Sequence, residues 1–400
     1  MIGAGPAGLM AADILSAAGQ AVTLYERMPS VGRKLLMAGR GGLNLTHSEP
    51  LEQFSPRYRE AAPWLAPLLK DFSPQDMIAW AHGLGQETFT GTSGRIFPKA
   101  MKASPLLRAW LARLAAHDVQ IKTRHDWQGW NEAGELVFEK GDEAIAASDD
   151  VVILALGGAS WPRLGSNGAW ARILEKRGIV LAPFRPANCG FHVAWSAAFA
   201  RFAGTPLKNI ALSFAGRSVR GEALITAYGI EGGAVYALSA DLRDAVEAQG
   251  HAILQIDLRP DLAPEQLTAK LARGAKDQSL ANRLRKAVAL SPAAINLLRE
   301  CHGMRLPEDS AALAAFIKSS SLTLTGTQSL GRAISTAGGV TLGALDESLM
   351  IMPGVFAAGE MLDWEAPTGG YLLQATLATG VAAAKGALRY IERQSLARST

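Results

Sequence analysis

The sequence predicts an α/β protein in which a Rossmann-type dinucleotide-binding domain is discontinuous along the chain, with a second domain inserted into it. Two observations predict the domain itself: the chain opens on a Gly-x-Gly-x-x-Gly pattern over residues 3–8, and the strand-like run that follows ends on Glu26. A third predicts the discontinuity, because two later apolar runs, far apart in the chain, also end in glycines, at Gly157 and Gly359. The 400 residues are enough for two or three domains.

Each glycine of the opening motif is expected to have a separate structural role. Gly3 permits a tight turn, Gly5 lets a pyrophosphate approach the backbone, and Gly8 lets the following helix pack closely on the sheet. Glu26 is placed to accept hydrogen bonds from the ribose of an adenosine. An ordinary glycine-rich turn is the alternative, but helix, second strand and terminal acid follow in the expected order and favour a dinucleotide site.

The strand that should precede this motif is almost missing. Only Met1 and Ile2 come before Gly3, where about five buried residues are expected. Several buried Val or Ile side chains at roughly 1.5–3 kcal/mol each would match the net stability of a typical domain, about 5–15 kcal/mol. We therefore hypothesise that the natural protein begins several residues upstream.

A second glycine-rich segment follows at residues 32–47. Its glycines alternate with the cations Arg33, Lys34 and Arg40, so the loop is suited to surround an anionic cofactor with backbone donors and positive charge. A mobile surface loop is the alternative.

The remaining elements follow in order. Residues 50–117 are rich in helix, and we expect their tryptophans to pack in the core. Ser104 and Pro105 are expected to form the cap and first turn of a helix that runs to about residue 116. Short alternating runs over 119–147 predict an antiparallel meander, and 151–156 a buried strand that ends at Gly157 and Gly158. Near the end, a strand over 353–358 that closes on Gly359 and Glu360 precedes a helix that residues 368–371 open and that runs to about residue 388.

The middle of the chain has a different character. We expect a dinucleotide-binding domain over 1–185 and 326–400, and an inserted substrate domain over 186–325 that is mostly β to residue 260 and mostly helical from 261. The helical part carries a run of cations that indicates a solvated face or, alternatively, a surface for an acidic partner or RNA. These cations are Lys270, Arg273, Lys276, Arg283, Arg285, Lys286 and Arg299.

Composition excludes several classes of protein. There are 40 Lys and Arg residues against 36 acidic ones, and the net charge of +4 is too small to indicate nucleic acid binding by itself. Cys189 and Cys301 form no Cys-x-x-Cys pair, and none of the seven histidines has metal-ligand spacing, so we expect no dithiol relay and no metal. No run has the length of a membrane span or the pattern of a signal peptide, and we expect a cytoplasmic protein without a membrane partner.

Taken together, the motifs resemble the BaiN-like (aminoacetone-oxidase-like) FAD-dependent oxidoreductases nearly from end to end. The resemblance is carried by residues 3–8 with Glu26, the 32–46 loop, Gly-Arg-Ile-Phe-Pro at 94–98, Leu-Gly-Gly-Ala-Ser-Trp-Pro at 156–162, Ser-Thr-Ala-Gly-Gly-Val at 335–340, Gly-Glu-Met-Leu-Asp at 359–363 and Gly-Gly-Tyr at 369–371. It implies FAD as the cofactor and an insert with a β-barrel-like part and a helical part.

The resemblance also implies roles for residues. Glu360 stands where the family more usually has an Asp that holds the ribityl chain, and the helix from Gly370 and Tyr371 would stabilise negative charge on the reduced flavin. The expected cofactor-binding residues are Gly3, Ala4, Gly5, Pro6, Ala7, Gly8, Glu26, Arg27, Gly32, Arg33, Lys34, Arg40, Gly41, Gly42, Asn44, Gly157, Gly158, Gly359, Glu360, Gly369, Gly370 and Tyr371. Two departures, Leu43 for a cysteine and an altered 226–233 segment, indicate a distinct subfamily.

Catalytic residues are less well defined. Tyr228 and Glu231 lie in a glycine-rich part of the insert and are candidates for a proton donor, with packing and turn roles as the alternative; His47 is a third candidate. The expected function is hydride transfer through FAD to or from a small organic molecule. No second dinucleotide motif is visible, so NAD(P)H as a transient reductant and reduction by the substrate both stay open. The alternatives are an FAD-dependent RNA-modifying or RNA-binding protein, and FAD in a purely structural role.

Overall fold

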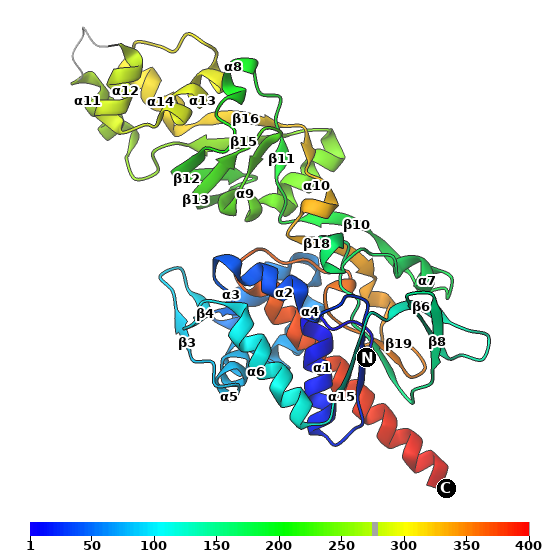
Figure 1. Cartoon of the computed structure of the whole chain (residues 1–400). Coiled ribbons are helices and arrows are strands. Elements are labelled where there is room, and N and C mark those ends of the chain that lie inside the picture. Colours follow the sequence, from blue (N-terminus) through cyan, green and yellow to red (C-terminus); the bar gives the residue numbers. More distant parts are fainter. Residues whose placement is uncertain (274–278, 400) are drawn as a thin grey trace. The chain divides into compact units, whose positions relative to one another are not determined.

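The structure, a computed structural model, describes residues 1–273 and 279–399 (Figure 1). The chain divides into two compact units. The main unit comprises Met1–Arg185 and Ile334–Thr400, and the insert comprises Pro186–Ala333. We expected the return to the first domain at residue 326, whereas the division falls at Ile334, because β17 (Gly326–Thr327), like β16 (Ser320–Leu324) before it, pairs within the sheet of the insert.

The main unit contains eight α-helices among its described residues. They are α1 (Pro6–Ala17), α2 (Arg33–Ala38), α3 (Leu51–Phe54), α4 (Ala62–Asp71), α5 (Pro74–Gly83), α6 (Ala103–Ala116), α7 (Ala171–Glu175) and α15 (Tyr371–Ser399). Its strands are β1 (Thr23–Glu26), β2 (Thr46–His47), β3 (Thr88–Thr90), β4 (Arg95–Pro98), β5 (Gln120–Thr123), β6 (Asp126–Trp130), β7 (Leu136–Lys140), β8 (Glu143–Ala147), β9 (Val152–Leu154), β10 (Leu181–Ala187), β18 (Ser335–Val340), β19 (Met350–Met352) and β20 (Val355–Ala357).

A parallel sheet forms the centre of the main unit. β5 pairs with β1 and β20 pairs with β9, both in parallel, and Ile2 bridges the two pairs through parallel bridges to Tyr25 and Leu154. The amide of Ile2 donates to the Ile153 carbonyl at 2.9 Å, and the Ile2 carbonyl accepts from Ala155 at 2.8 Å. The strand order β5, β1, Ile2, β9, β20 is that of a Rossmann-type sheet, with the first strand reduced to Ile2.

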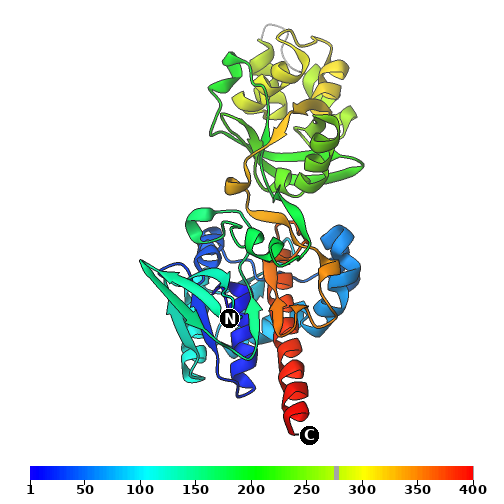
Figure 2. The same cartoon turned by 90° about the vertical axis from the view of Figure 1, so that its right-hand side faces the viewer.

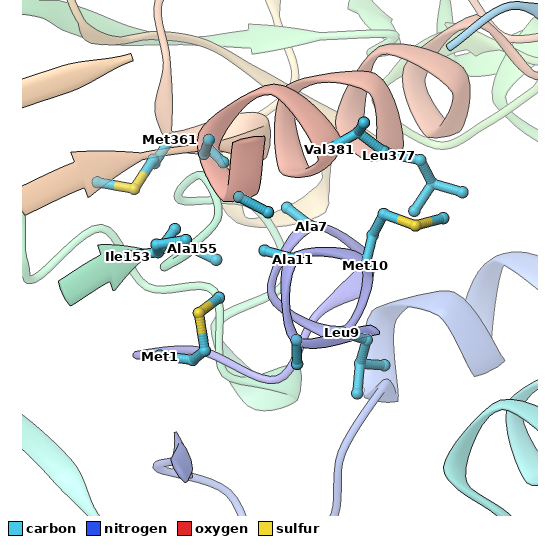
Figure 3. Close-up of a cluster of buried hydrophobic side chains, with 14 of the residues drawn as sticks. Met1, Ala7, Leu9, Met10, Ala11, Ile153, Ala155, Met361, Leu377 and Val381 are labelled. Atoms are coloured by element: carbon cyan, nitrogen blue, oxygen red, sulfur yellow. The ribbon is translucent and has the colours of Figure 1, made fainter. Parts of the chain in front are cut away.

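Helices α1 and α15 pack on this sheet and on each other. Figure 3 shows Ala7, Met10 and Ala11 of α1 beside Leu377 and Val381 of α15, in a cluster that also includes Met1 and Ile153. The two helices approach closely because small residues line their contact. A Cβ on Gly380 would lie 2.6 Å from the Ala7 carbonyl oxygen, which leaves room for glycine alone.

Several sequence expectations are refined by the main unit. The buried strand predicted at 151–156 is β9, and the antiparallel meander is confirmed for β6, β7 and β8, whereas β5 pairs in parallel with β1. The cap predicted at Ser104 is wrong, because α6 begins at Ala103 and its N-cap, Lys102, makes no side-chain hydrogen bond. The final helix extends past the predicted residue 388 to Ser399.

The insert combines one sheet with a set of helices. Its strands are β11 (Phe191–His192), β12 (Pro206–Phe214), β13 (Arg217–Ile225), β14 (Gly229–Glu231), β15 (Ala252–Asp257), β16 and β17, in the order β16-β15-β12-β13-β14-β11-β17. Its helices are α8 (Ala197–Ala200), α9 (Gly233–Tyr236), α10 (Ser239–Gln249), α11 (Pro264–Ala272), α12 (Leu280–Val288), α13 (Pro292–His302) and α14 (Ser310–Lys318).

The pairings within the insert are antiparallel, and the helical stretch expected from residue 261 corresponds to α11–α14 (Figures 1 and 2). One of its predicted surface cations, Lys276, lies outside the described residues. No helix in the described part of the chain combines the length and the apolar character of a membrane span.

Candidate functional site

The glycine-rich turn before α1 is built as the sequence predicts. Gly3 has φ of +101°, which favours glycine, and a Cβ at this position would overlap the Ala155 carbonyl oxygen. A Cβ at Gly8 would overlap the Gly3 carbonyl oxygen, so the helix meets the turn backbone to backbone. Beside Gly5, the N-cap of α1, no atom lies within 4 Å of the Cβ position, which leaves open space at the helix N-terminus.

Glu26 lies at the end of β1, where its carboxylate reaches the same turn. Its two oxygens accept the amides of Ala4, at 2.9 Å, and of Met28, at 2.8 Å. Burial raises the pKa of Glu26, and these two amide hydrogen bonds oppose that effect. The carboxylate therefore fixes the turn, and a carboxylate has further lone pairs for hydroxyl donors.

The second glycine-rich segment is joined to this turn. The Gly32 amide, at the start of α2, donates to the Ala4 carbonyl at 2.9 Å. The arginines of the segment differ in their surroundings. Arg33 donates to Ser30 at 3.0 Å, its charge lowers the pKa of Glu26, and its Nε is buried without a hydrogen-bond partner. Arg40 is exposed in a short 3-10 turn. Arg27, at the end of β1, pairs with Asp126 at 3.5 Å.

Lys34 joins the segment to the later strand ends. Its ammonium donates to both carboxylate oxygens of Glu360, at 2.8 and 2.6 Å, and to the hydroxyl of Ser160 at 2.8 Å. Glu360 also accepts the amide of Thr336 at 3.0 Å. We call Lys34, Ser160, Thr336 and Glu360 the Lys34 network.

The two later glycine-rich strand ends pack on the Lys34 network and on the first turn of α1. A Cβ at Gly158, after β9, would overlap the Thr336 side chain, and Gly157 has φ of +70°. Gly359, after β20, has φ of +84°, and its Cβ position lies 2.7 Å from the Ala7 Cβ of α1. The turn after β20 therefore packs on the first turn of α1.

The N-terminus of α15 packs on β2. Gly369 and Gly370 have φ of +130° and +98°, and a Cβ on Gly370 would lie 2.5 Å from the Cα of Thr46. Two side-chain oxygens of the second glycine-rich segment, Asn44 Oδ1 and Thr46 Oγ1, are buried and have no hydrogen-bond partner. Such orphaned buried atoms are costly, and they indicate that a polar group belongs beside them.

Tyr371, the first residue of α15, is held at several points. Its hydroxyl donates to Glu49 at 2.6 Å, and its carbonyl accepts the hydroxyl of Tyr58 at 2.7 Å. Arg57 donates to both oxygens of Glu49, at 3.0 and 2.8 Å, and the ring of His47 stacks on Tyr371. Burial and the hydrogen bond to Glu49 raise the pKa of Tyr371.

The sequence analysis did not name four of the residues around α15. Thr46 lies in β2, Glu49 in the connection between β2 and α3, and Arg57 and Tyr58 in the 3-10 segment Ser55–Ala61, and only the fold brings them to α15. For Thr46, its position two residues after Asn44 in the glycine-rich segment was the available signal.

In the insert, the structure brings together the two candidates for proton transfer. The hydroxyl of Tyr228 donates to the carboxylate of Glu231. Burial, and to a smaller extent this hydrogen bond, raises the pKa of Tyr228. A Cβ on Gly190 would lie 2.6 Å from the Tyr228 hydroxyl oxygen, so glycine makes room for the pair. His47, the third candidate, lies in the main unit beside Tyr371.

Comparison with protein families gives one match that spans most of the chain. The family model described as HI0933-like protein Rossmann domain matches residues 1–386. A relative from Clostridium scindens named 3-dehydro-bile acid delta(4,6)-reductase is 27% identical over 407 residues, 97% of this chain and 98% of the relative. A relative from Escherichia coli named ribosomal RNA dihydrouridine synthase is 25% identical over 392 residues, 94% of each chain.

Solved structures resemble the fold at lower identity. The open conformation of a flavocytochrome c3 fumarate reductase has a TM-score of 0.53 at 15% identity, with 97% of this chain and 77% of that chain covered. A 3-ketosteroid delta1-dehydrogenase from Sterolibacterium denitrificans, in complex with 1,4-androstadiene-3,17-dione, has a TM-score of 0.53 at 12% identity, with 97% and 98% covered. At these identities the likeness establishes the fold alone.

Proposed function

The chain belongs to the HI0933-like family of Rossmann-domain proteins, and from that premise we propose that it is an FAD-dependent oxidoreductase that reduces a carbon–carbon double bond conjugated to a carbonyl in a small organic molecule.

The convergence of glycine-rich segments in the main unit supports FAD. The turn at residues 3–8, the segment from Gly32, and the strand ends at Gly157 and Gly359 meet around the N-terminus of α1 and the Lys34 network. The segment that packs on the N-terminus of α15 through Thr46 carries the orphaned side-chain oxygens of Asn44 and Thr46, which lack a polar partner. A long cofactor with a pyrophosphate in its middle and a polar ring at one end fits this donor set.

Each part of the cofactor then has a set of residues to hold it. We assign the pyrophosphate to the amides of residues 3–8, and the adenosine ribose to Glu26. The ring is assigned to Asn44, Thr46 and the Gly370 amide. Of the other residues predicted from the sequence, Arg27 and Arg33 lie near enough to Glu26 to lower its pKa, Arg40 is exposed, and the glycines belong to the same segments.

When bound, FAD supplies the hydride chemistry. The chain contributes electrostatics and protons. The positive end of the α15 dipole, held in place by Tyr371 and Glu49, stabilises negative charge beside Gly370. In the insert, Tyr228 with Glu231 is our candidate for the proton donor, because its hydroxyl is paired with a carboxylate and both side chains are partly exposed.

The names of the relatives support the substrate class. One is named a delta(4,6)-reductase of a 3-dehydro-bile acid and another a dihydrouridine synthase, and both names describe the removal of a carbon–carbon double bond. In both kinds of substrate such a bond lies in conjugation with a carbonyl, which makes its far carbon a hydride acceptor. We propose the same reaction class for this chain.

An anaerobic titration tests the reaction. The purified protein is titrated with NADH and with NADPH, and the loss of the flavin band in the visible spectrum reports reduction. A 3-keto-4-ene steroid and cyclohex-2-enone are then added to the reduced protein. We expect the band to return and the product to gain two hydrogens. Reduced protein that oxygen reoxidises but no enone reoxidises would contradict the proposal.

RNA as the substrate is a second candidate, favoured by the name of the Escherichia coli relative and by the cations of α11–α13. Electrostatic RNA binding weakens steeply as salt is added. Retention of the protein on ribosomal RNA at low salt, with a steep loss on adding salt, would favour this candidate. No retention at low salt would remove it.

A further inference from the structure

We propose that Lys34 is a positioning residue that neutralises Glu360 and orients its carboxylate toward the cofactor. The inference rests on the proposed binding of FAD and adds a role for a residue that the sequence analysis treated as a direct ligand of an anionic group. The two side chains come from distant parts of the chain, α2 and the turn after β20. Their ion pair is among the more buried ones, with 23% of the Lys34 side chain and 9% of the Glu360 side chain exposed.

The donors of Lys34 are used within the protein. An ammonium group has three N–H bonds, and the Lys34 ammonium makes three hydrogen bonds, two to Glu360 and one to Ser160. A phosphate could be bound only at the expense of one of these bonds. We therefore infer that Lys34 acts on the cofactor through Glu360.

The carboxylate of Glu360 is nearly saturated in turn. It accepts two hydrogen bonds from Lys34 and one from the Thr336 amide, and a carboxylate has about four acceptor positions. About one position is left for a hydroxyl of the cofactor. Lys34 and Thr336 together determine where that position points.

Lys34 also neutralises the negative charge of Glu360. A buried carboxylate without a counterion is costly, and the cost rises when an anionic pyrophosphate or an electron-rich reduced flavin comes close. Paired with Lys34, Glu360 presents a neutral pair with one free acceptor. Without Lys34, the same carboxylate opposes both cofactor binding and reduction of the flavin.

The network also connects the pair to the glycine-rich strand end after β9. The Thr336 hydroxyl oxygen accepts the amides of Ala159 and Ser160, at 2.9 and 3.1 Å. Loss of the charge pair is therefore expected to loosen this strand end as well.

A double-mutant cycle tests the inference. The variants are Lys34→Met, Glu360→Gln and the two together. Lys34→Met keeps most of the length of the side chain but removes its charge. Lys99→Met is the matched control, because Lys99 is an exposed lysine that pairs with Glu87 on the surface. The readouts are the dissociation constant of FAD from the apoprotein, by fluorescence titration, and the midpoint potential of the bound flavin.

The expected results follow from the charge. Lys34→Met weakens FAD binding by roughly tenfold or more and shifts the flavin potential to more negative values, since Glu360 is then uncompensated. Glu360→Gln has a smaller effect, because an unpaired Lys34 still faces an anionic cofactor. The double variant regains most of the loss seen in Lys34→Met, and Lys99→Met matches the wild type.

Three outcomes would overturn the inference: unchanged FAD affinity and potential in Lys34→Met, effects that simply multiply in the double variant, or a double variant as impaired as Lys34→Met. If Lys34→Met alone does not fold, recovery of folding and FAD binding in the double variant supports the charge pair, and no recovery refutes it. Failure of the wild type to bind FAD is a separate result that would defeat the proposed function itself.

Discussion

At the scale of single residues, Gly8 illustrates how tightly the α1 turn is packed. A side chain at Gly8 would overlap the Gly3 carbonyl oxygen, and backbone cannot move aside as a flexible side chain can. We predict that Gly8→Ala lowers the free energy of unfolding by at least the ~1–3 kcal/mol typical of overpacked sites and abolishes FAD binding. The measurements are denaturant unfolding and FAD titration.

Gly83→Ala is the control for this variant. Gly83 ends α5, and no atom lies within 4 Å of its Cβ position, so FAD binding should match the wild type and stability should be equal or slightly higher, because alanine is the better helix former. Wild-type FAD affinity in Gly8→Ala would show that the turn does not hold the cofactor.

Asp13 links α1 to α5 and α6. Its buried carboxylate accepts the indole N–H groups of Trp110, at 3.1 Å, and Trp80, at 3.3 Å, and pairs with Arg113. We predict that Asp13→Ala destabilises the protein by about 3–5 kcal/mol, because it leaves buried donors and a cation without partners. Thermal and denaturant unfolding measure the loss.

The control for Asp13 is an exposed aspartate. Asp71 pairs with Lys385 at 3.5 Å on the surface, and Asp71→Ala should change stability by no more than about 0.5 kcal/mol. Equal effects of the two variants would contradict a structural role for the Asp13 cluster.

Single residues also show how far the sequence was informative. The glycines of the opening motif were predictable, because their spacing reflects the physical need for positive φ and close approach. The partners of Glu26 and Lys34 were not predictable, since a carboxylate or ammonium in a sequence does not reveal which buried group the fold brings to it. Whether Glu26 contacts a ribose stays a prediction.

At the scale of elements, the N-terminus of α15 depends on an ionised Glu49. Burial alone would raise the pKa of Glu49, but its hydrogen bonds from Arg57 and Tyr371 outweigh burial, and the pKa lies below its ordinary value of 4.5. A carboxyl group with a lowered folded pKa stabilises the fold fully above its ordinary pKa, and this contribution is lost as the pH falls through the folded pKa.

We therefore predict that the stability difference between the wild type and Glu49→Gln is constant above about pH 5 and shrinks as the pH falls below 4.5. Urea unfolding over a series of pH values measures it. A difference that grows on acidification would show that Glu49 is not the ionised partner of Tyr371 and Arg57.

Elements were predicted well where local pattern decides them and less well where tertiary pairing does. The antiparallel strands β6–β8 follow from alternation and turn residues, and α11–α14 from helical periodicity. β5 belongs to the same run of sequence as the meander, yet it adds to the parallel sheet beside β1. The Ser104 cap failed because Ser-Pro is also compatible with the first turn of a helix that has already begun.

At the scale of the whole molecule, the main unit is assembled from two distant parts of the chain. Residues after Ile334 supply β20, the Glu360 turn and α15, while residues before Arg185 supply β1, β9 and α1. The sequence suggested this division through glycine-rich strand ends on both sides of the insert. The point of return was misplaced by eight residues because β17 has only two residues and carries too little pattern to assign, and only its pairing with β11 places it in the insert.

The central claim is that these separated segments bind one FAD. The most direct test is the cofactor content of the purified protein. The visible spectrum, with chromatography and mass spectrometry of the cofactor released on denaturation, measures it, and FAD is added where the protein is isolated without it. The account predicts one tightly bound FAD for each chain. A colourless protein that does not take up added FAD, or one that binds FMN in preference, would contradict it.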